Sequence, residues 1–251
     1  MKTPFARTIC PSRAAFTLVE LLAIVAVLGL LALVHVQGLS HTRNRSQDIV
    51  DFYNNKQLMA AANMYAAEHN DILPGCGWGT ADDCWAYSKL TFGAQAESLR
   101  RGQLFQYVKD EKVFMCPIDK PDNLFYLRAI LITSYTWNAA VCGYGYLTTP
   151  SGGIGSYKLA QFRPNAILQW EADGTSPFFF TDAACIPDEG ISARHGTAAT
   201  VGLISGGIQR VSLNQWFTSN YAGTSGQRGS AIPTTQLPNQ LWCNPGNRWG
   251  R

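Results

Sequence analysis

The chain has 251 residues, of which 15% are charged and 46% are hydrophobic, and its formal net charge is +3. This length suits one sizeable domain with an additional element and excludes three domains. The basic residues form no block with interleaved aromatic residues, which excludes a nucleic-acid-binding surface of the usual kind.

Residues 16–36 form the least charged segment and predict a membrane-spanning helix. Glu20 is their only acid, and His35 is their only other ionisable residue. A helix of this length would measure about 32 Å, against a hydrocarbon core of about 30 Å. The apolar run is longer than the core of a secretory signal peptide. Basic residues before it predict a cytoplasmic N-terminus and export of the rest of the chain.

Glu20 distinguishes this segment from a plain signal anchor. An acid at membrane depth costs roughly 3 kcal/mol on insertion scales, so it usually has a partner and a task. The octapeptide AFTLVELL, which begins at Ala15, resembles the processing site of type IV prepilins and type II secretion pseudopilins. In that family a prepilin peptidase removes a basic leader, the new N-terminal Phe is methylated, and the fifth mature residue is Glu.

The resemblance implies cleavage between Ala15 and Phe16, with Ala15 standing where the family prefers Gly. It also implies N-methylation of Phe16 and, in a filament, an ion pair between Glu20 and the Phe16 amine of a neighbouring subunit. Such a pair in a low dielectric fixes register more than it adds net stability. The implied partners are prepilin peptidase, other pilin or pseudopilin subunits and the inner membrane, without nucleic acid.

The helical pattern continues beyond residue 36 with more polar residues. Apolar residues recur at mixed spacings of three and four as far as Tyr65, which predicts an amphipathic helix with one face on a domain. Asn70, Asp71 and Pro74 predict its end. The predicted organisation is a cleaved leader at 1–15, a membrane helix at 16–36, its amphipathic continuation at 37–70, and an exported globular domain at 71–251.

The exported domain alternates short apolar runs with turns rich in Gly, Pro and Ser. These runs predict a short helix at 99–108, a hairpin turn at 205–207, and strands at 134–138, 166–172, 199–204 and 208–213. The predicted fold class is α+β. We expect a pilin-like long N-terminal helix, membrane-spanning in its first half, packed on a small antiparallel β-sheet with long irregular loops.

Several motifs of the exported domain resemble a group of pseudopilin-like proteins known by a C-terminal H-x9-D-G motif. The Cys-Pro segment of that group corresponds to Cys116 and Pro117, and its Ala-Asp-Gly turn corresponds to Asp173 and Gly174. The matching stretches cover most of the chain from residue 16 to residue 213.

His195 precedes Ser205 and Gly206 at the spacing of this C-terminal motif, with Ser205 where the group has Asp. The motif has no known catalysis in that group. We therefore interpret His195 as structural rather than as a general base paired with a nearby acid, and we expect no enzymatic activity. An anchored hydrolase that uses His195 is the alternative.

Six cysteines lie beyond the leader, which contains Cys10. An even number in an oxidising compartment predicts disulfides. A zinc site is the alternative, but the Cys-x2–4-Cys spacing that favours zinc is absent. The predicted pairs are Cys76–Cys84, which closes a short loop, Cys116–Cys142 and Cys185–Cys243.

Four acids between residues 173 and 189 offer oxygen atoms that suit a hard cation. Major pseudopilins of type II secretion, which resemble this architecture, hold calcium in a C-terminal loop. The spacing fits no EF-hand loop, and we interpret these acids as solvated loop residues. The sequence therefore predicts no metal and no cofactor, with calcium as the open alternative at Asp173, Asp182, Asp188 and Glu189.

Two functions follow from these observations. The first is a structural subunit of a type IV pilus-like filament or a type II secretion pseudopilus, single-pass in the bacterial inner membrane, with a cytoplasmic leader and a periplasmic domain. The second is a monomeric, membrane-tethered periplasmic binding or adaptor module that holds a carbohydrate by aromatic stacking. The tryptophans considered for that role are Trp78, Trp85, Trp137, Trp216, Trp242 and Trp249.

Overall fold

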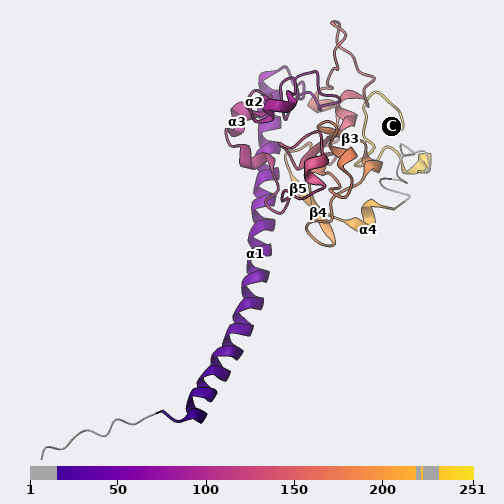
Figure 1. Cartoon of the computed structure of the whole chain (residues 1–251). Coiled ribbons are helices and arrows are strands. Elements are labelled where there is room, and N and C mark those ends of the chain that lie inside the picture. The colour runs from indigo at the N-terminus through magenta and orange to yellow at the C-terminus, as the bar shows by residue number, and fades with distance from the viewer. Residues whose placement is uncertain (1–15, 219–221, 223–231) are drawn as a thin grey trace, which may run out of the picture. The chain divides into compact units, whose positions relative to one another are not determined.

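The computed structural model describes residues 16–218, 222 and 232–251, and the side chains of residues 32–44 lie outside this description. The predicted leader, with Ala15 and Cys10, therefore lies outside the described residues. The chain divides into two compact units, Met1–Ser46 and Gln47–Arg251, which are described separately (Figure 1).

Helix α1 runs from Leu18 to Glu68 and contributes to both units. In the second unit its side chains at 58, 59, 61 and 62 are buried against the domain. The helix ends before Asn70 and Asp71, whose φ angles of 55° and 70° are left-handed and cannot continue it.

The N-terminal part of α1 corrects the predicted fold class. Among the residues whose side chains are described, no helix is long and apolar enough to cross a membrane. The prediction of a membrane-spanning first half is therefore wrong for the helix as described.

The second unit contains one five-stranded sheet in the order β3-β1-β2-β4-β5. The pairs β1–β2, β2–β4 and β4–β5 are antiparallel, whereas β1–β3 is parallel. The predicted antiparallel sheet is thus wrong: the sheet is mixed, because the chain after β2 returns along the far side of β1. The strands are β1 (Tyr135–Asn138), β2 (Ile167–Glu171), β3 (Ala184–Cys185), β4 (Ala198–Leu203) and β5 (Ile208–Ser212).

The remaining helices are short. A single predicted helix at 99–108 is instead α2 (Gln95–Arg100) and α3 (Phe105–Val108). The chain breaks near Gly102, where a Cβ atom would lie 2.7 Å from the Ala86 backbone. Helix α4 covers Leu213–Trp216, and 3-10 turns occupy Phe92–Ala94, Glu111–Phe114, Phe125–Leu127, Ala139–Cys142, Leu159–Gln161, Pro177–Phe180, Pro187–Glu189 and Thr234–Gln236.

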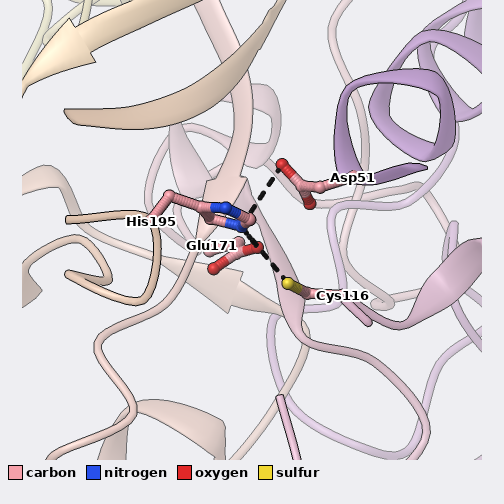
Figure 2. A group of neighbouring side chains, drawn as sticks. All are labelled: Asp51, Cys116, Glu171 and His195. Carbon is pink, nitrogen blue, oxygen red and sulfur yellow. Dashed lines mark hydrogen bonds and ion pairs between the residues drawn. The ribbon is translucent and has the colours of Figure 1, made fainter. Parts of the chain in front are cut away.

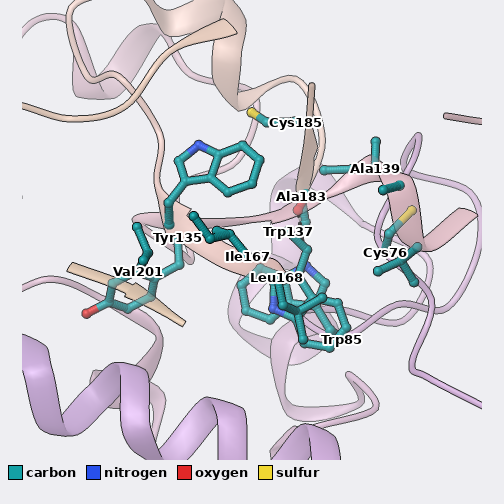
Figure 3. Close-up of a cluster of buried hydrophobic side chains, with 14 of the residues drawn as sticks. Cys76, Trp85, Tyr135, Trp137, Ala139, Ile167, Leu168, Ala183, Cys185 and Val201 are labelled. Carbon is teal, nitrogen blue, oxygen red and sulfur yellow. Dashed lines mark hydrogen bonds between the residues drawn. The ribbon is translucent and has the colours of Figure 1, made fainter. Parts of the chain in front are cut away.

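Two stacked tryptophans lie at the centre of the core (Figure 3). The Trp85 and Trp137 rings are 5.4 Å apart and nearly parallel, and both are fully buried. The indole N–H of Trp137 donates to Gln169 Oε1 at 3.0 Å, and Gln169 Nε2 donates to Asn55 Oδ1 on α1 at 2.9 Å. A satisfied polar chain thus joins the core, the sheet and the helix.

Close packing of α1 on the sheet requires a glycine in β4. A Cβ atom at Gly202 would lie 2.5 Å from the sulfur of Met59, which is itself fully buried. The absence of a side chain at residue 202 lets the helix approach the strand and brings polar residues of α1 near the ends of β2 and β4.

Candidate functional site

His195 is the centre of a buried polar cluster in the second unit (Figure 2). Its Nδ1 atom lies 2.6 Å from Asp48 Oδ1. Its Nε2 atom lies 3.1 Å from Glu171 Oε1, 3.3 Å from Cys116 Sγ and 3.6 Å from Asp51 Oδ2. One ligand atom each of Asp51, Cys116, Glu171 and His195 lies within 4.8 Å of all the others. Only 1% of the His195 side chain is exposed.

The four residues come from four separate parts of the fold. Asp51 lies on α1, Glu171 is the last residue of β2, and His195 lies in the turn before β4. Cys116 follows the 3-10 turn at 111–114, and its backbone N–H donates to Ser134 Oγ at 3.0 Å. Sequence-distant residues therefore meet only when the whole domain is folded.

The outer atoms of the cluster are held by hydrogen bonds. Asp51 Oδ1 accepts from the Tyr135 hydroxyl at 2.7 Å and from Asn55 Nδ2 at 3.3 Å. Glu171 Oε2 accepts from Arg194 at 3.2 Å. Asp51 Oδ2, in contrast, is buried and has no hydrogen-bond partner. A buried, unpartnered carboxylate oxygen is costly, and here it is directed at the imidazole.

The electrostatics of the cluster are dominated by burial and by three neighbouring acids. Burial and the Glu171 charge raise the pKa of Asp51 to about 7. Burial acts to raise the pKa of Glu171, but the hydrogen bond from His195 and the Arg194 charge lower it to about 2. Burial acts to lower the pKa of His195, but its bond to Glu171 and the nearby carboxylates raise it to about 9. The cluster thus attracts positive charge.

A Cys-His-Asp nucleophile is one chemical interpretation of this geometry. Cys116 Sγ, the imidazole and Asp48 follow one another at hydrogen-bonding distances, and Cys116 borders a cavity of about 590 Å³. However, Cys116 is 1% exposed, and burial together with the charges of Glu171 and Asp51 raises the pKa of its thiol. A reactive thiolate needs the opposite environment, so the arrangement suits a bound cation better than a nucleophile.

A second ion-pair network lies beside the cluster. Arg128 makes two hydrogen bonds to Asp119, at 2.7 and 3.0 Å, and both side chains are 3% exposed. Arg194 lies 3.2 Å from Asp119 and joins this pair to Glu171. The Arg194 side chain passes so close to Gly174 that a Cβ atom on residue 174 would collide with it. This contact gives the glycine of the Asp-Gly turn a packing role.

The other motif residues have local structural roles. Pro117 directly follows Cys116, and Asp173 Oδ1 accepts from the Thr175 backbone N–H at 2.9 Å. Ser205 and Gly206 lie in the predicted hairpin turn between β4 and β5, and the φ of Gly206 is +83°. A left-handed turn position favours glycine.

The calcium candidates are not brought together as a group of close ligand atoms within the described residues. Asp182 accepts from the backbone N–H groups of Gly79 and Ala184, at 2.8 and 3.0 Å. Glu189 accepts from the Ile186 backbone N–H at 2.8 Å, and Asp188 is buried. The carboxylates of Asp173 and Glu189 therefore hold local turns, whereas Asp182 joins the turn before Ala184 to the distant loop at Gly79.

None of the predicted disulfides is formed: all six described cysteines are free thiols. The predicted partner of Cys76 is Cys84, but Cys76 Sγ instead lies 2.7 Å from Cys142 Sγ. Cys185 Sγ lies 3.6 Å from the Phe179 carbonyl oxygen, and Cys243 Sγ lies 3.6 Å from Asn138 Nδ2. The pairing inferred from closeness in sequence is replaced by contacts set by the fold.

We expect Cys76 and Cys142 to form a disulfide when an oxidant such as oxidised glutathione accepts the two electrons. Their sulfur atoms are already in contact, and the bond would close a loop whose two ends are 66 positions apart in the sequence. Closing such a loop stabilises a fold by about 4 kcal/mol in the chain-entropy account. Peptide mapping without reduction should find a Cys76–Cys142 peptide. A Cys76–Cys84 peptide in its place would contradict this expectation.

The tryptophans proposed for carbohydrate stacking are mostly part of the core. Trp85, Trp137, Trp216 and Trp242 are at most 1% exposed and offer no face to a ligand. Trp78 and Trp249 are half-buried. The aromatic richness of the domain is therefore explained largely by its packing.

The processing and assembly residues lie in the first unit. Phe16 is 75% exposed, and Glu20 Oε2 accepts from the backbone N–H and the hydroxyl of Thr17, each at 2.9 Å. Glu20 thus caps the first turn of α1.

Sequence reasoning missed Asp48, Asp51 and Glu171 as members of the cluster. A signal was present on α1: residues 48, 51 and 55 continue the spacing of the buried positions 58 and 62 and are all polar. Polar residues on a buried stripe need partners, and this pattern identifies a polar site beneath a helix. Glu171 gave a weaker signal as a single acid at the end of an apolar strand.

In comparisons with known proteins, no protein-family model, no curated protein and no solved structure matches this chain.

Proposed function

We propose that the chain is a structural subunit that assembles with copies of itself, as pilins do, through the apolar N-terminal part of α1. The observation that carries this proposal is that every described side chain of that segment is exposed. All described side chains from 16 to 31 are exposed, including Leu18 at 75%, Ile24 at 45% and Leu30 at 65%. Burial of one such side chain stabilises by about 1.5–3 kcal/mol.

The pattern of exposed residues favours several neighbours over one. Apolar residues face every side of this helical segment, and a helix that is apolar all round is normally buried on all sides. One groove on one partner would cover a single stripe only. Parallel copies of the same segment would cover the whole circumference, as in the core of a filament.

Glu20 supports the same arrangement. It is the only acid in the apolar run, and removal of a leader at Ala15 would place a charged amine at Phe16. In a bundle of apolar helices either charge alone would be costly to bury. A neighbour's amine paired with Glu20 offsets that cost and sets the axial register. Cleavage by a prepilin peptidase is therefore part of the proposal, and a periplasmic location stays a prediction.

The test measures the filament yield of the parent chain and of two variants. The host is a bacterium that has a prepilin peptidase and a pilus or type II secretion assembly apparatus. Glu20→Gln should reduce sheared filaments about a hundredfold or more, because an unpaired buried charge costs about 3–5 kcal/mol per subunit. The amount of chain in the cell should stay unchanged.

Glu97→Gln is the matched control, since Glu97 lies on α2 with a half-exposed side chain that forms surface ion pairs with Arg100 and Arg101. Its filament yield should equal that of the parent chain. Equal yields from the parent chain and Glu20→Gln would refute assembly through Glu20, and a processed parent chain that forms no filament would refute the subunit proposal.

A further inference from the structure

We propose that Asp51, Cys116, Glu171 and His195 bind one zinc ion in a closed, four-ligand site that fastens α1 to the sheet. The distances between the ligand atoms support such a site. With the usual zinc–ligand distances and tetrahedral angles, a nitrogen and a sulfur ligand lie about 3.6 Å apart, and a nitrogen and an oxygen ligand about 3.3 Å apart. From His195 Nε2 the observed separations are 3.3 Å to Cys116 Sγ, 3.1 Å to Glu171 Oε1 and 3.6 Å to Asp51 Oδ2. A small shift of side chains suffices for binding.

The outer contacts of the ligands support this assignment independently of the distances. Metal-binding histidines normally donate their other ring N–H to a carboxylate or carbonyl, which fixes the tautomer. Here Nδ1 of His195 faces Asp48 Oδ1 at 2.6 Å, so Nε2 is left to bind the ion. Glu171 and Asp51 each use one oxygen for an outer partner and direct the other inward.

Asp51 Oδ2 provides the second independent observation. This oxygen is fully buried and has no hydrogen-bond partner. Each of its possible partners inside the cluster is a ligand atom of the proposed site. His195 Nε2 lies 3.6 Å from Asp51 Oδ2, which is beyond hydrogen-bonding distance, and a cation at the centre would satisfy the oxygen directly.

The charges of the site also balance around a divalent ion. Two carboxylates and a thiolate would carry three negative charges, and a zinc ion supplies two positive charges. Arg194, at 3.2 Å from Glu171, supplies a further positive charge at the edge of the site. A buried group of this composition carries much less net negative charge with the ion than without it, which lowers the cost of its burial.

The donor set selects zinc over calcium or magnesium. Calcium takes six to eight oxygen ligands and magnesium an octahedron of oxygens, whereas thiolate and imidazole suit zinc. Asp51, Cys116 and Glu171 are buried residues, and the side chain of His195 is only 1% exposed. Four protein ligands without an open position are typical of a structural site.

This role also explains the arrangement of the cysteines. Cys116 is committed to the cluster and Cys142 is in contact with Cys76, so the predicted Cys116–Cys142 pair has no place in the fold. Because the four ligands come from α1, a loop, β2 and the turn before β4, zinc binding would be linked to folding of the whole domain.

The experiment uses the purified full chain, stripped with a chelator and titrated with zinc chloride. We expect about one zinc ion per chain by elemental analysis. The midpoint of thermal unfolding should rise by about 10 °C when free zinc exceeds the dissociation constant by about a thousandfold. Cobalt substitution should give a thiolate-to-cobalt charge-transfer band, which Cys116→Ser removes and Cys185→Ser, at a buried cysteine outside the site, retains.

A measurement on the unaltered chain covers the case in which Cys116→Ser fails to fold. In a urea concentration that half unfolds the chelated chain, Cys116 should react with iodoacetamide, and added zinc should suppress this labelling. The proposal is overturned if zinc leaves both the unfolding midpoint and Cys116 labelling unchanged, or if Cys116→Ser retains the cobalt–thiolate band. Filament formation plays no part in these readouts.

Discussion

Asp119→Ala is expected to lower the free energy of unfolding by about 3–5 kcal/mol. The replacement leaves the guanidinium of Arg128 as a buried cation without its anion, between the rings of Phe125 and Phe180, which lie 4.7 and 3.9 Å from it. Urea unfolding followed by tryptophan fluorescence measures the loss. The change removes the partner of a charge whose side chain is only 3% exposed, which is the costly way to break an ion pair.

Two variants separate this effect from general loss of a side chain. Glu97→Ala breaks ion pairs with side chains about half exposed, and should cost less than about 1 kcal/mol. The double variant Asp119→Ala/Arg128→Met removes both charges and should regain part of the loss. A double variant less stable than Asp119→Ala would contradict a penalty from an unpaired arginine.

Trp137→Ala should cost about 3–5 kcal/mol, because it empties the centre of the core. The ring is fully buried, stacks on Trp85, and binds Gln169 through its N–H. Trp137→Phe keeps most of the ring but leaves the Gln169 oxygen without its donor, so we expect a loss of about 1–3 kcal/mol. Equilibrium unfolding with circular dichroism as the signal measures both losses.

Phe178→Ala is the control for an aromatic residue outside the core. Phe178 is 79% exposed, so its removal should change stability by less than about 0.5 kcal/mol. If Trp137→Ala were as harmless as Phe178→Ala, the stacked tryptophans would not be the centre of the packed core.

The strands were predictable where a local pattern and a turn signal agreed. The predicted strands at 134–138, 166–172, 199–204 and 208–213 correspond to β1, β2, β4 and β5, with ends shifted by one residue or less. Strand β3 has two residues, which is too short for any alternation. Its parallel pairing with β1 depends on the path of a long loop, and no local residue pattern encodes that path.

The cluster around His195 shows the limit of sequence reasoning for a site. The sequence indicates separate roles for His195 and Cys116, because 79 positions separate them along the chain. Closeness in sequence points to other acids as partners of His195, whereas the fold supplies Asp48, Asp51 and Glu171. Tertiary packing of α1 on the sheet decides which acids reach the imidazole.

The same limit applies to the cysteines. Closeness in sequence favoured Cys76–Cys84, while a glycine-rich loop carries these residues to different neighbours. Gly77 has a φ of +88° and lies so close to Ala183 that a Cβ atom would be 2.7 Å from the Ala183 Cβ. A loop of this geometry leaves Cys76 facing Cys142, a residue of the 3-10 turn after β1.

Assembly through a processed N-terminus is tested most directly by the intact mass of the chain recovered from cells with an active prepilin peptidase. The proposed function predicts a chain that begins at Phe16 and carries one methyl group on its amine. Recovery of a chain that still begins at Met1, from cells in which a known prepilin is cut to completion, would contradict it.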